Sequence, residues 1–543
     1  MPKPTASRTD ARVVPVVIIG AGPTGASAAI LLAQRNVDCV LLERWPEVYP
    51  LPRAVHFDDE VFRTFAAMGI ARAVQRISRP ARGMQLVDAD LNVLAEFTRD
   101  AHAQQHGFPE SNMFDQPDLE HILRARIAEL PAIELRGGVE VIDVSQPATG
   151  PAPVRVRYRA SDSEGEDAER EIWAHAVLGC DGANSLTRAC IGARLESMRF
   201  EQRWLVVDVR SDRPLEVYDG VQQVCSHTRA ATFMPITPGR YRWELRLLAH
   251  EDPDQLCDAT ALDRLRPWLG TGDTNDPAHL QVLRRTAYTF RGAIADRWQD
   301  RRVFLLGDAA HLTPPFIGQG MCAGIRDAAN LTWKLALVLA GQAEDTLLAS
   351  YERERRPYAR RVIRMAIAIG WIMTGGTRAT ARLRRMMLRT IARLPGVEHK
   401  VLTATWPALR HSPLIAGHDR LAGRLCPQPR IRTTGGDVPL DAALGDGFTI
   451  ITRDPEVEGV AGMPAHVLHL TRQAATGSVV DIDGVLGRLL DAARAEAILV
   501  RPDRVIACSG TRAELARWSQ RAAASGILLP SSVGIDIRSA GRS

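Results

Sequence analysis

The chain has 543 residues, more than one hydrophobic core usually supports, so we expect two or three structural units. Hydrophobic residues make up 45% of the chain and charged residues 24%, which is ordinary for a globular enzyme. The net charge of +5 is small for this length and the basic residues are scattered, so the composition argues against a nucleic-acid-binding protein.

The eight cysteines are widely separated, with no CxxC pair and no zinc-ligand spacing to histidine. We therefore expect reduced thiols in a cytoplasmic protein and no structural metal. The first dozen residues lack the apolar core of a signal peptide. The most apolar stretch outside the glycine loops, residues 365–373, is far shorter than the roughly 20 residues of a membrane span. We expect no transmembrane segment and no stable membrane association.

The N-terminal region is predicted to form a βαβ unit. Residues 13–19 are rich in β-branched side chains, as in a strand buried on both faces. Residues 25–34 are rich in Ala and Leu and favour a helix, and a second apolar strand ends at Glu43.

The middle of the chain alternates between two kinds of structure. Apolar residues alternate with polar ones in residues 83–97 and 202–250, which predicts antiparallel strands with one covered face. Between these regions, residues 117–128 favour a helix, and residues 154–158 and 176–180 favour strands. The pattern indicates a nucleotide-binding fold that is interrupted by a sheet domain and then resumed.

The C-terminal part begins with predicted helices at residues 327–340 and 347–373. Residues 378–394 predict an amphipathic helix, whose arginines face solvent or, alternatively, an anionic membrane surface. Residues 407–436 are dense in Pro, Gly and Arg and indicate a linker. The remaining region is predicted to be a small α/β unit, with strands at residues 448–452, 465–470, 498–501 and 504–508 and helices at residues 486–495 and 511–524.

A glycine loop follows the first predicted strand, where Gly20, Gly22 and Gly25 have the spacing GxGxxG. The first glycine permits the tight turn, the second lets the backbone approach a pyrophosphate, and the third allows close helix packing. The helix start then offers N–H groups and a positive dipole end to the phosphates. Glu43, 18 residues after Gly25, is placed to accept hydrogen bonds from ribose hydroxyls. These features predict a dinucleotide site.

A second loop lies almost 300 residues downstream, at residues 307–320, between a predicted strand and a helix. Asp308 is suited to bind a ribityl hydroxyl at the strand end, and Gly318 and Gly320 can place backbone N–H groups near a pyrophosphate or flavin ring. These roles suit FAD better than a nicotinamide nucleotide. Between the two loops, Asp181 and Gly182 end a further strand.

These three motifs, in this order, resemble the single-component FAD aromatic monooxygenases of the para-hydroxybenzoate hydroxylase type. The chain looks most like the 3-(3-hydroxyphenyl)propionate / 3-hydroxycinnamate hydroxylases of that group. The likeness extends over nearly the whole chain and includes residues 49–60, 112–120, 204–209, 324–336 and 500–507.

The resemblance implies a mixed α/β and α+β architecture with three parts. These are an interrupted Rossmann-like FAD domain, an antiparallel-sheet substrate domain and a C-terminal thioredoxin-like domain that, without CxxC, has no redox role. The expected boundaries are FAD domain 13–82, 113–195 and 286–405, substrate domain 83–112 and 196–285, linker 406–436 and thioredoxin-like domain 437–543.

The resemblance also implies roles for particular residues. Arg53 would reach the flavin or the pyridine nucleotide, and Gln116 would contact FAD. Asp181 and Gly182 would be shared between FAD and NAD(P)H binding. Asp308 would hold the ribityl chain, and the flavin ring would be bordered by Pro315, Gly318 and Gly320.

The implied reaction uses NADH or NADPH to reduce FAD, after which O2 gives a C4a-hydroperoxyflavin that hydroxylates a small aromatic substrate. The expected position is ortho to the hydroxyl of a substituted phenol, plausibly a 3-(3-hydroxyphenyl)propionate-like compound in aromatic catabolism. A base near the phenol would help, because phenol titrates near pH ~10. A homodimer is compatible with this prediction.

Two features depart from the hydroxyphenylpropionate enzymes: His56, and the run Pro314-Pro315-Phe316-Ile317 beside the expected flavin. His56 is a candidate phenol base, with a histidine satisfied by the protein as the alternative. Pro315 is the other candidate at the reaction centre.

Three arginines at 240, 242 and 246 are candidates to pair with a substrate carboxylate. Strand alternation places Arg242 and Arg246 on one face, and exposure to solvent is the favoured interpretation for each of the three. Two alternatives to the phenol hydroxylase stay open. One is a tailoring hydroxylase of a larger polyphenol or polyketide, and the other is a flavin-binding protein without oxygenase activity.

Overall fold

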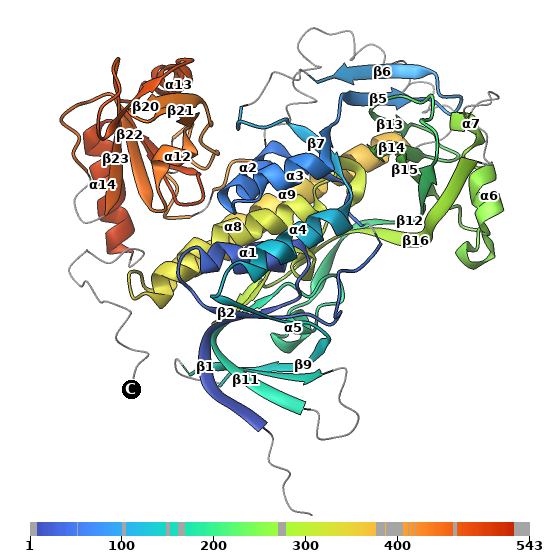
Figure 1. Cartoon of the computed structure of the whole chain (residues 1–543), viewed down its shortest axis with the longest axis horizontal. Helices are drawn as coiled ribbons and strands as arrows, with labels where there is room; N and C mark the ends of the chain where they lie inside the picture. The colour runs from blue at the N-terminus through green and yellow to red at the C-terminus, as the bar shows by residue number, and fades with distance from the viewer. Residues whose placement is uncertain are drawn as a thin grey trace, which may run out of the picture.

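The computed structural model describes residues 8–51, 53–99, 105–147, 152–160, 169–269, 279–375, 386, 406–410, 412–416, 419–459 and 464–525. Figure 1 shows a central layer of helices with one sheet beneath it, a second sheet at one end and a smaller unit at the other. The amphipathic helix predicted at residues 378–394 lies outside the described residues, except for Met386. Within the described part of the chain, no helix is both long and apolar enough to cross a membrane.

The first sheet is the predicted Rossmann-like sheet, and its strands come from three separate stretches of the chain. Neighbouring strands run parallel in the order β18-β11-β1-β2-β8, and β17, β10 and β9 add antiparallel edges. The bounds are β1 Arg8–Ile19, β2 Cys39–Leu42, β8 Ile133–Arg136, β9 Val139–Ser145, β10 Val154–Ala160, β11 Glu169–Gly179, β17 Gln299–Asp300 and β18 Val303–Leu305.

The helices of the central layer are α1 (Pro23–Ala33), α4 (Gln116–Ala128) and α8 (Gly320–Leu339). Helix α1 packs between α4 and α8, as Figure 1 also shows. A side chain at Gly324 would overlap the hydroxyl of Thr24, so this glycine lets α8 approach α1 closely. The long helix α9 (Ala349–Thr374) follows, and the shorter helices are α2 Asp59–Ala67, α3 Ala71–Ile77 and α5 Leu186–Cys190.

The second sheet has the strand order β19-β16-β12-β15-β14-β13-β5-β6. It is antiparallel as predicted, except that β13 and β5 run parallel, and this pair joins the two alternating segments. Its bounds are β5 Gly83–Val87, β6 Val93–Thr98, β12 Leu195–Ser211, β13 Val221–Val224, β14 Ala231–Thr237, β15 Arg240–Arg246, β16 Leu280–Ala295 and β19 His311–Leu312.

Alternation along the second sheet creates two different faces. One face is apolar, with Val207, Phe233 and Trp243 in a core that also includes residues of α6 (Asp258–Asp263) and α7 (Arg266–Leu269). The other face turns toward the helical layer. A small third sheet, β3-β7-β4, links the two regions, with bounds β3 His56–Asp58, β4 Ser78–Pro80 and β7 Ser111–Phe114.

The C-terminal unit is the predicted thioredoxin-like domain. Strands β24, β23 and β22 are parallel, and β25 and β26 continue the sheet in antiparallel fashion. Residues 430–433 of the expected linker form β20 of this sheet. The bounds are β20 Arg430–Thr433, β21 Gly436–Pro439, β22 Phe448–Thr452, β23 Ala465–Leu470, β24 Ser478–Asp481, β25 Ala497–Val500, β26 Ile506–Gly510, α12 Asp441–Leu444, α13 Val485–Ala493 and α14 Arg512–Ala524.

Buried ion pairs fasten the C-terminal unit to the helical layer. Glu354 on α9 accepts hydrogen bonds from both Nη atoms of Arg501 at 2.9 Å and from Lys334 Nζ on α8 at 2.9 Å. All three side chains are inaccessible to solvent. A second pair joins Arg63 on α2 to Asp441. The C-terminal unit is therefore docked on α2, α8 and α9, of which α8 begins at the second glycine loop.

Candidate active site

A cavity of about 1360 Å³ lies between the helical layer, the second sheet and the C-terminal unit. Its wall includes Gly22 at the start of α1, Asp308, Gly320 at the start of α8, and Thr232 and Glu244 on the second sheet. This volume exceeds the roughly 300–1,000 Å³ of a pocket for a drug-sized ligand. The cavity is therefore large enough to hold a dinucleotide and a substrate together.

The GxGxxG loop has the backbone geometry that its spacing predicts. Gly20 has φ +98°, and a side chain there would overlap the carbonyl oxygen of Cys180. A side chain at Gly25 would overlap the carbonyl oxygen of Gly20. Gly22 faces open space at the cavity, and no side chain caps the start of α1 there. The first turn of α1 can therefore offer its N–H groups to phosphate oxygens.

Glu43 is held at the edge of this loop. Its Oε2 accepts a hydrogen bond from the Ala21 N–H at 2.6 Å, and its Oε1 accepts one from the Trp45 N–H at 3.0 Å. Each carboxylate oxygen has a second lone pair, so the group keeps acceptor capacity. The predicted contact with ribose hydroxyls stays a prediction.

The turn at Gly307-Asp308 is anchored by a buried acid on α8. The Gly307 N–H donates to Asp327 Oδ2 at 3.1 Å, and Asp327 also binds His311 Nε2 and Arg355 Nε, both at 2.7 Å. The Asp308 side chain is instead exposed to the cavity. Desolvation by the surrounding protein raises the pKa of Asp308, and the charges of His311 and Arg53 oppose this shift. Asp308 is thus placed to bind a hydroxyl group.

The run after Asp308 forms a short 3-10 helix, Pro315–Ile317, that ends at Gly318 with φ +63°. A side chain at Gly318 would come within 2.7 Å of His56 Nδ1, so this position needs glycine for space as well as for conformation. Gly320 begins α8 and faces open space. Pro315, Gly318 and Gly320 all line the cavity.

Arg53 and Gln116 also line the cavity. The Arg53 guanidinium lies 4.7 Å from the centre of the Tyr49 ring. Gln116 begins α4, where its Oε1 accepts from the Ala54 N–H at 2.6 Å and its Nε2 donates to Glu120 at 2.6 Å. Both residues face the cavity, and their individual roles stay predictions.

The Asp181 side chain is bound by neighbouring protein groups, whereas Gly182 faces the cavity. The Asp181 carboxylate accepts hydrogen bonds from Ser185 Oγ at 2.6 Å and from the N–H and Oγ1 of Thr187 at 2.9 and 3.0 Å. Gly182 lines the cavity with nothing within 4 Å of a side chain built on it. The aspartate therefore holds the start of α5, and the glycine is the part of this motif that faces the cavity.

His56, the candidate phenol base, is satisfied by the protein. Its Nδ1 lies 3.3 Å from the Gly318 carbonyl oxygen and its Nε2 lies 2.8 Å from Ser111 Oγ. Because a carbonyl only accepts, Nδ1 carries the hydrogen and Nε2 accepts from Ser111. Burial lowers the pKa of His56 to about 4. The ring is neutral at pH 7 and a weak base, which favours the structural alternative.

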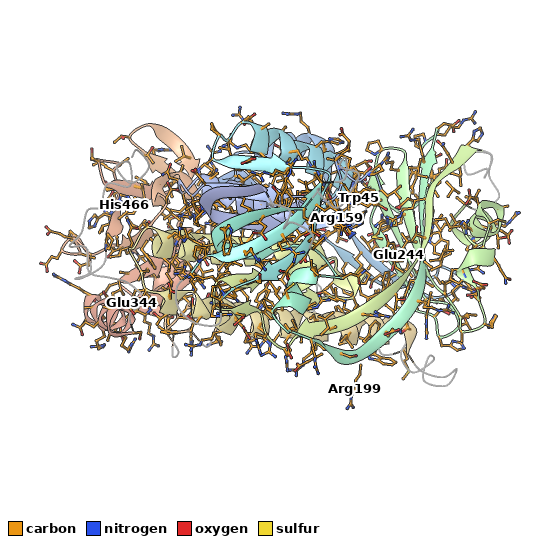
Figure 2. All side chains as sticks on the ribbon, turned by 90° about the horizontal axis from the view of Figure 1, so that it is seen from below. Trp45, Arg159, Arg199, Glu244, Glu344 and His466 are labelled. Carbon is orange, nitrogen blue, oxygen red and sulfur yellow. The ribbon has the colours of Figure 1, made fainter. Side chains whose placement is uncertain are left out.

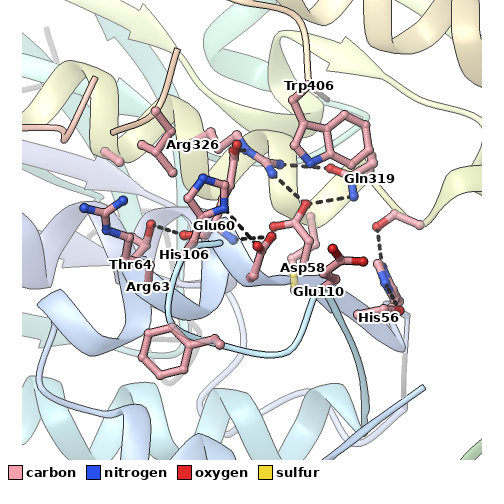
Figure 3. Close-up of a pocket in the computed structure, with 18 of the residues that line it drawn as sticks. His56, Asp58, Glu60, Arg63, Thr64, His106, Glu110, Gln319, Arg326 and Trp406 are labelled. Carbon is pink, nitrogen blue, oxygen red and sulfur yellow. Dashed lines mark hydrogen bonds and ion pairs between the residues drawn. The ribbon is translucent and has the colours of Figure 1, made fainter. Parts of the chain in front are cut away.

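A buried cluster that the sequence analysis missed lies beside His56 (Figure 3). Arg326 on α8 binds Asp58 and Glu60 at 2.6 Å, and Gln319 bridges to both Arg326 and Asp58 at 2.9 and 3.0 Å. Asp58 and Glu60 lie more than 250 residues before Gln319 and Arg326 in the chain, so sequence spacing alone could not pair them. The acidic run at residues 58–60 was the one available signal. The cluster ties α2 to the start of α8.

The three candidate substrate arginines have other partners. Arg240 pairs with Asp115. Arg242 is only 2% exposed and binds Asp208 at 2.6 and 3.0 Å, so the expectation that it faces solvent was wrong. Burial is tolerated because Asp208, opposite it on β12, compensates its charge. Arg246 donates to the carbonyl of Thr374 at 3.2 Å and is not among the cavity-lining residues.

Glu244, which the sequence analysis also missed, lies between these arginines on β15 and lines the cavity. It is only 8% exposed, yet its carboxyl group has no hydrogen-bond partner among the described residues. Burial raises the pKa of Glu244 to about 7, with the charge of Asp208 adding to this effect and that of Arg242 opposing it. The alternation of charged residues at 242, 244 and 246 was its only signal in the sequence.

The residues of the cavity fit FAD. Open space lies beside Gly22, Gly182 and Gly320, two uncapped helix starts face the cavity, and Asp308 offers a carboxylate between them. This is the donor and acceptor set for a pyrophosphate and a polyhydroxylated chain. Among the described residues, no group of three or more His, Cys, Asp or Glu side chains is arranged to hold a metal ion.

Comparisons with known proteins agree with this fit. Residues 13–366 match the "FAD binding domain" family, and residues 423–525 match the "HcaD C-terminal domain". A "Probable NADH-specific resorcinol 4-hydroxylase" of Rhodococcus jostii (strain RHA1) is 34% identical over 96% of both chains. A "3-(3-hydroxy-phenyl)propionate/3-hydroxycinnamic acid hydroxylase" of Burkholderia cenocepacia (strain HI2424) is 30% identical over 92% of this chain and 94% of its own.

Among solved structures, a complex of aklavinone-11 hydroxylase with FAD and aklavinone superposes with a TM-score of 0.75. It covers 94% of this chain and 98% of its own at 22% identity, so this likeness shows the fold alone. The two sequence relatives cover the chain almost completely and at higher identity. With the matched FAD domain and the cavity that fits the cofactor, they show that the chain belongs to the FAD-dependent aromatic hydroxylases.

Proposed function

We propose that this hydroxylase uses NADH or NADPH and O2 to hydroxylate a single-ring phenol at a carbon ortho to its hydroxyl group. The observation that carries the proposal is the shared cavity, in which the glycine loops of the FAD domain face the polar side of the second sheet. A ring bound against that sheet would lie beside the loop at Pro315–Ile317. Both sequence relatives bear names of hydroxylases of substituted single-ring phenols.

Bound FAD, reduced by the nicotinamide nucleotide, would supply the oxygen-transfer chemistry. The starts of α1 and α8 would hold its phosphates and ring through backbone N–H groups, and Asp308 would hold its hydroxylated chain. Phe290, Phe316 and Met234 line the cavity and would exclude water from the ring of the substrate. The role of the protein would therefore be to position FAD and the substrate and to exclude water from them.

The alternative of a larger polyphenol or polyketide substrate is supported by likeness of fold to enzymes such as aklavinone-11 hydroxylase. That support is weaker, because at 22% identity the likeness shows the fold alone. A cytoplasmic location and a homodimer belong to the same proposal. All eight cysteines are free thiols, as expected in a reducing compartment.

The test is a panel of phenols incubated with the FAD-loaded protein, either nucleotide and O2. The panel contains resorcinol, 3-(3-hydroxyphenyl)propionate and a polycyclic phenol, and hydroxylated product is measured by mass spectrometry. We expect a product from one of the two single-ring phenols. A product from the polycyclic phenol alone would support the tailoring enzyme, and nucleotide oxidation without any product would support a flavin-binding protein that is not an oxygenase.

A further inference from the structure

The cavity-facing side of the second sheet carries an acid, Glu244, that has no hydrogen-bond partner among the residues that the structure describes. Glu244 stands at the centre of this side, with the uncharged Val206 opposite it on β12 and Thr232 opposite it on β14. Figure 2 shows Glu244 among the strands of this sheet. Its side chain is more than nine-tenths buried and lines the cavity. A buried carboxyl group without a hydrogen bond is costly unless a ligand completes it.

The charged neighbours of Glu244 are already engaged. On its own strand, Arg242 is held by Asp208 through both Nε and Nη2, and its Nη1 donates to the Arg53 carbonyl oxygen at 2.7 Å. Arg246 reaches away to the Thr374 carbonyl oxygen. Arg242 and Asp208 are engaged with each other, and their charges act on Glu244 in opposite directions.

This arrangement has a consequence for the substrate. A hydroxyl group can donate a hydrogen bond to the Glu244 carboxylate, and such a charge-assisted bond is strong in a dry cavity. A carboxylate can only accept, and beside Glu244 it would meet like charge at short range. The site favours a ligand that brings a proton donor and no negative charge.

Resting on the proposed function, we propose that Glu244 binds the phenolic hydroxyl of the substrate, acts as its base, and selects uncharged phenols over phenols that bear a carboxylate. The O–H bond of the phenol breaks, its electron pair stays on oxygen, and the proton passes to Glu244. The ring becomes more electron-rich for oxygen transfer. The proton returns to that oxygen when the ring regains aromaticity and releases its own hydrogen to solvent.

The half-buried Glu251 shows the opposite state of a carboxylate in this protein. Glu251 accepts hydrogen bonds from Arg229, from Arg264 and from the Leu248 N–H. These partners lower the pKa of Glu251 to about 2, although burial opposes them. Glu244 differs because its partner has to come from the cavity.

The experiment uses the FAD-loaded protein without nucleotide, so that no turnover occurs. Resorcinol and 3-(3-hydroxyphenyl)propionate are titrated at pH 6 and pH 8, and the dissociation constant is read from the flavin absorbance. The wild-type protein should bind resorcinol at least tenfold more tightly than the propionate at pH 8. Glu244→Gln should weaken resorcinol binding about tenfold or more at pH 8, and it should remove the difference between the two ligands.

Two further variants separate this role from a structural one. Glu244→Asp keeps the carboxylate and should bind resorcinol with intermediate affinity and a retained pH dependence. Glu201→Gln is the matched control, because Glu201 is an exposed acid on β12 of the same sheet and should leave both affinities unchanged. The flavin content of every variant is measured first, so that a folding defect is recognised.

Tighter binding of the propionate by the wild-type protein at pH 8 would overturn the proposal. Unchanged resorcinol affinity and pH dependence in Glu244→Gln would overturn it equally. The titrations do not depend on product formation. A protein that binds resorcinol through Glu244 yet forms no hydroxylated product would contradict the proposed function and leave the binding role of Glu244 established.

Discussion

Two buried glutamates lie in different regions of this protein and have opposite surroundings. Glu354, at the interface between the helical layer and the C-terminal unit, accepts hydrogen bonds from Arg501, Lys334 and Asn330. These partners hold its pKa well below the ordinary value despite burial. Glu244, on the second sheet, has no such partner, and burial raises its pKa to about 7.

The difference shows that burial of an acid does not by itself indicate its role. A carboxylate surrounded by cations and amide donors joins two parts of the fold. A carboxyl group at a cavity that has no hydrogen-bond partner in the protein receives its hydrogen bond from a ligand. Removing either glutamate, or a charged or basic residue near Glu244, therefore tests this contrast.

The largest effect is expected from Glu354→Ala, which leaves Arg501 and Lys334 buried without their shared acid. We expect the free energy of unfolding to fall by about 3–5 kcal/mol, as for other broken buried ion pairs. Urea denaturation at pH 7 measures it. The exposed Glu458→Ala should change this quantity by less than about 0.5 kcal/mol. Equal effects of the two substitutions would refute the structural role of Glu354.

A smaller loss is expected from Asp208→Asn, which removes the acid that engages Arg242. The free energy of unfolding should fall by roughly 2–4 kcal/mol, because the amide still accepts one hydrogen bond. Arg242 would then be available to Glu244 two residues away, and the pKa of Glu244 should fall below 7. The check is the pH dependence of resorcinol affinity, whose midpoint should move to lower pH. A midpoint that moves upward would contradict this coupling.

Glu244→Gln should change the free energy of unfolding in the opposite direction, because it should stabilise the protein at pH 8. The folded-state pKa of about 7 lies above the unfolded value, so the protonated carboxyl favours folding below about pH 4.5, and this contribution is lost as pH rises to 7. The glutamine variant avoids that loss. We expect it to be about 1–3 kcal/mol more stable than wild type at pH 8 and nearly equal at pH 4.5. Urea denaturation of the FAD-loaded, substrate-free proteins measures both values.

The smallest effect is expected from His56→Gln. Because burial lowers the pKa of His56 to about 4, the ring is neutral throughout the range from pH 6 to 9. A pH midpoint of hydroxylation near 7 should therefore persist in His56→Gln, shifted by less than roughly half a unit, and disappear in Glu244→Gln. Loss of the midpoint in the histidine variant instead would restore His56 as the phenol base.

The glycine loops could be predicted from the sequence because each lies between a strand and a helix that are close in the chain. Gly20 and Gly25 are confirmed in the expected close contacts, and Gly320 begins a helix at the cavity. The strands and helices that were predicted in the C-terminal unit also agree to within a few residues, whereas β20, β21, β24 and α12 were not predicted. Local patterns were sufficient wherever the chemistry rests on backbone shape.

Side-chain partners could not be predicted in the same way. Arg242 was expected at the surface, yet Asp208, 34 residues earlier, makes its burial possible. Asp181 was predicted to be shared between FAD and NAD(P)H binding, and the sequence did not indicate that its carboxylate also binds the start of α5. His56 meets Gly318 across more than 260 residues. Alternation assigns a residue to a face of a strand, but it does not say what lies opposite that face.

The sequence by itself determined that this protein binds FAD and carries out aromatic hydroxylation, because the motifs specify backbone turns and helix starts over short stretches of chain. The tertiary structure decided which acids and bases are engaged by the protein and which face the cavity. That outcome depends on charges brought together from distant segments, since a buried charge is neutralised only by groups within a few ångströms of it. Glu244 and Glu354 are both buried glutamates, and only their neighbours in space distinguish them.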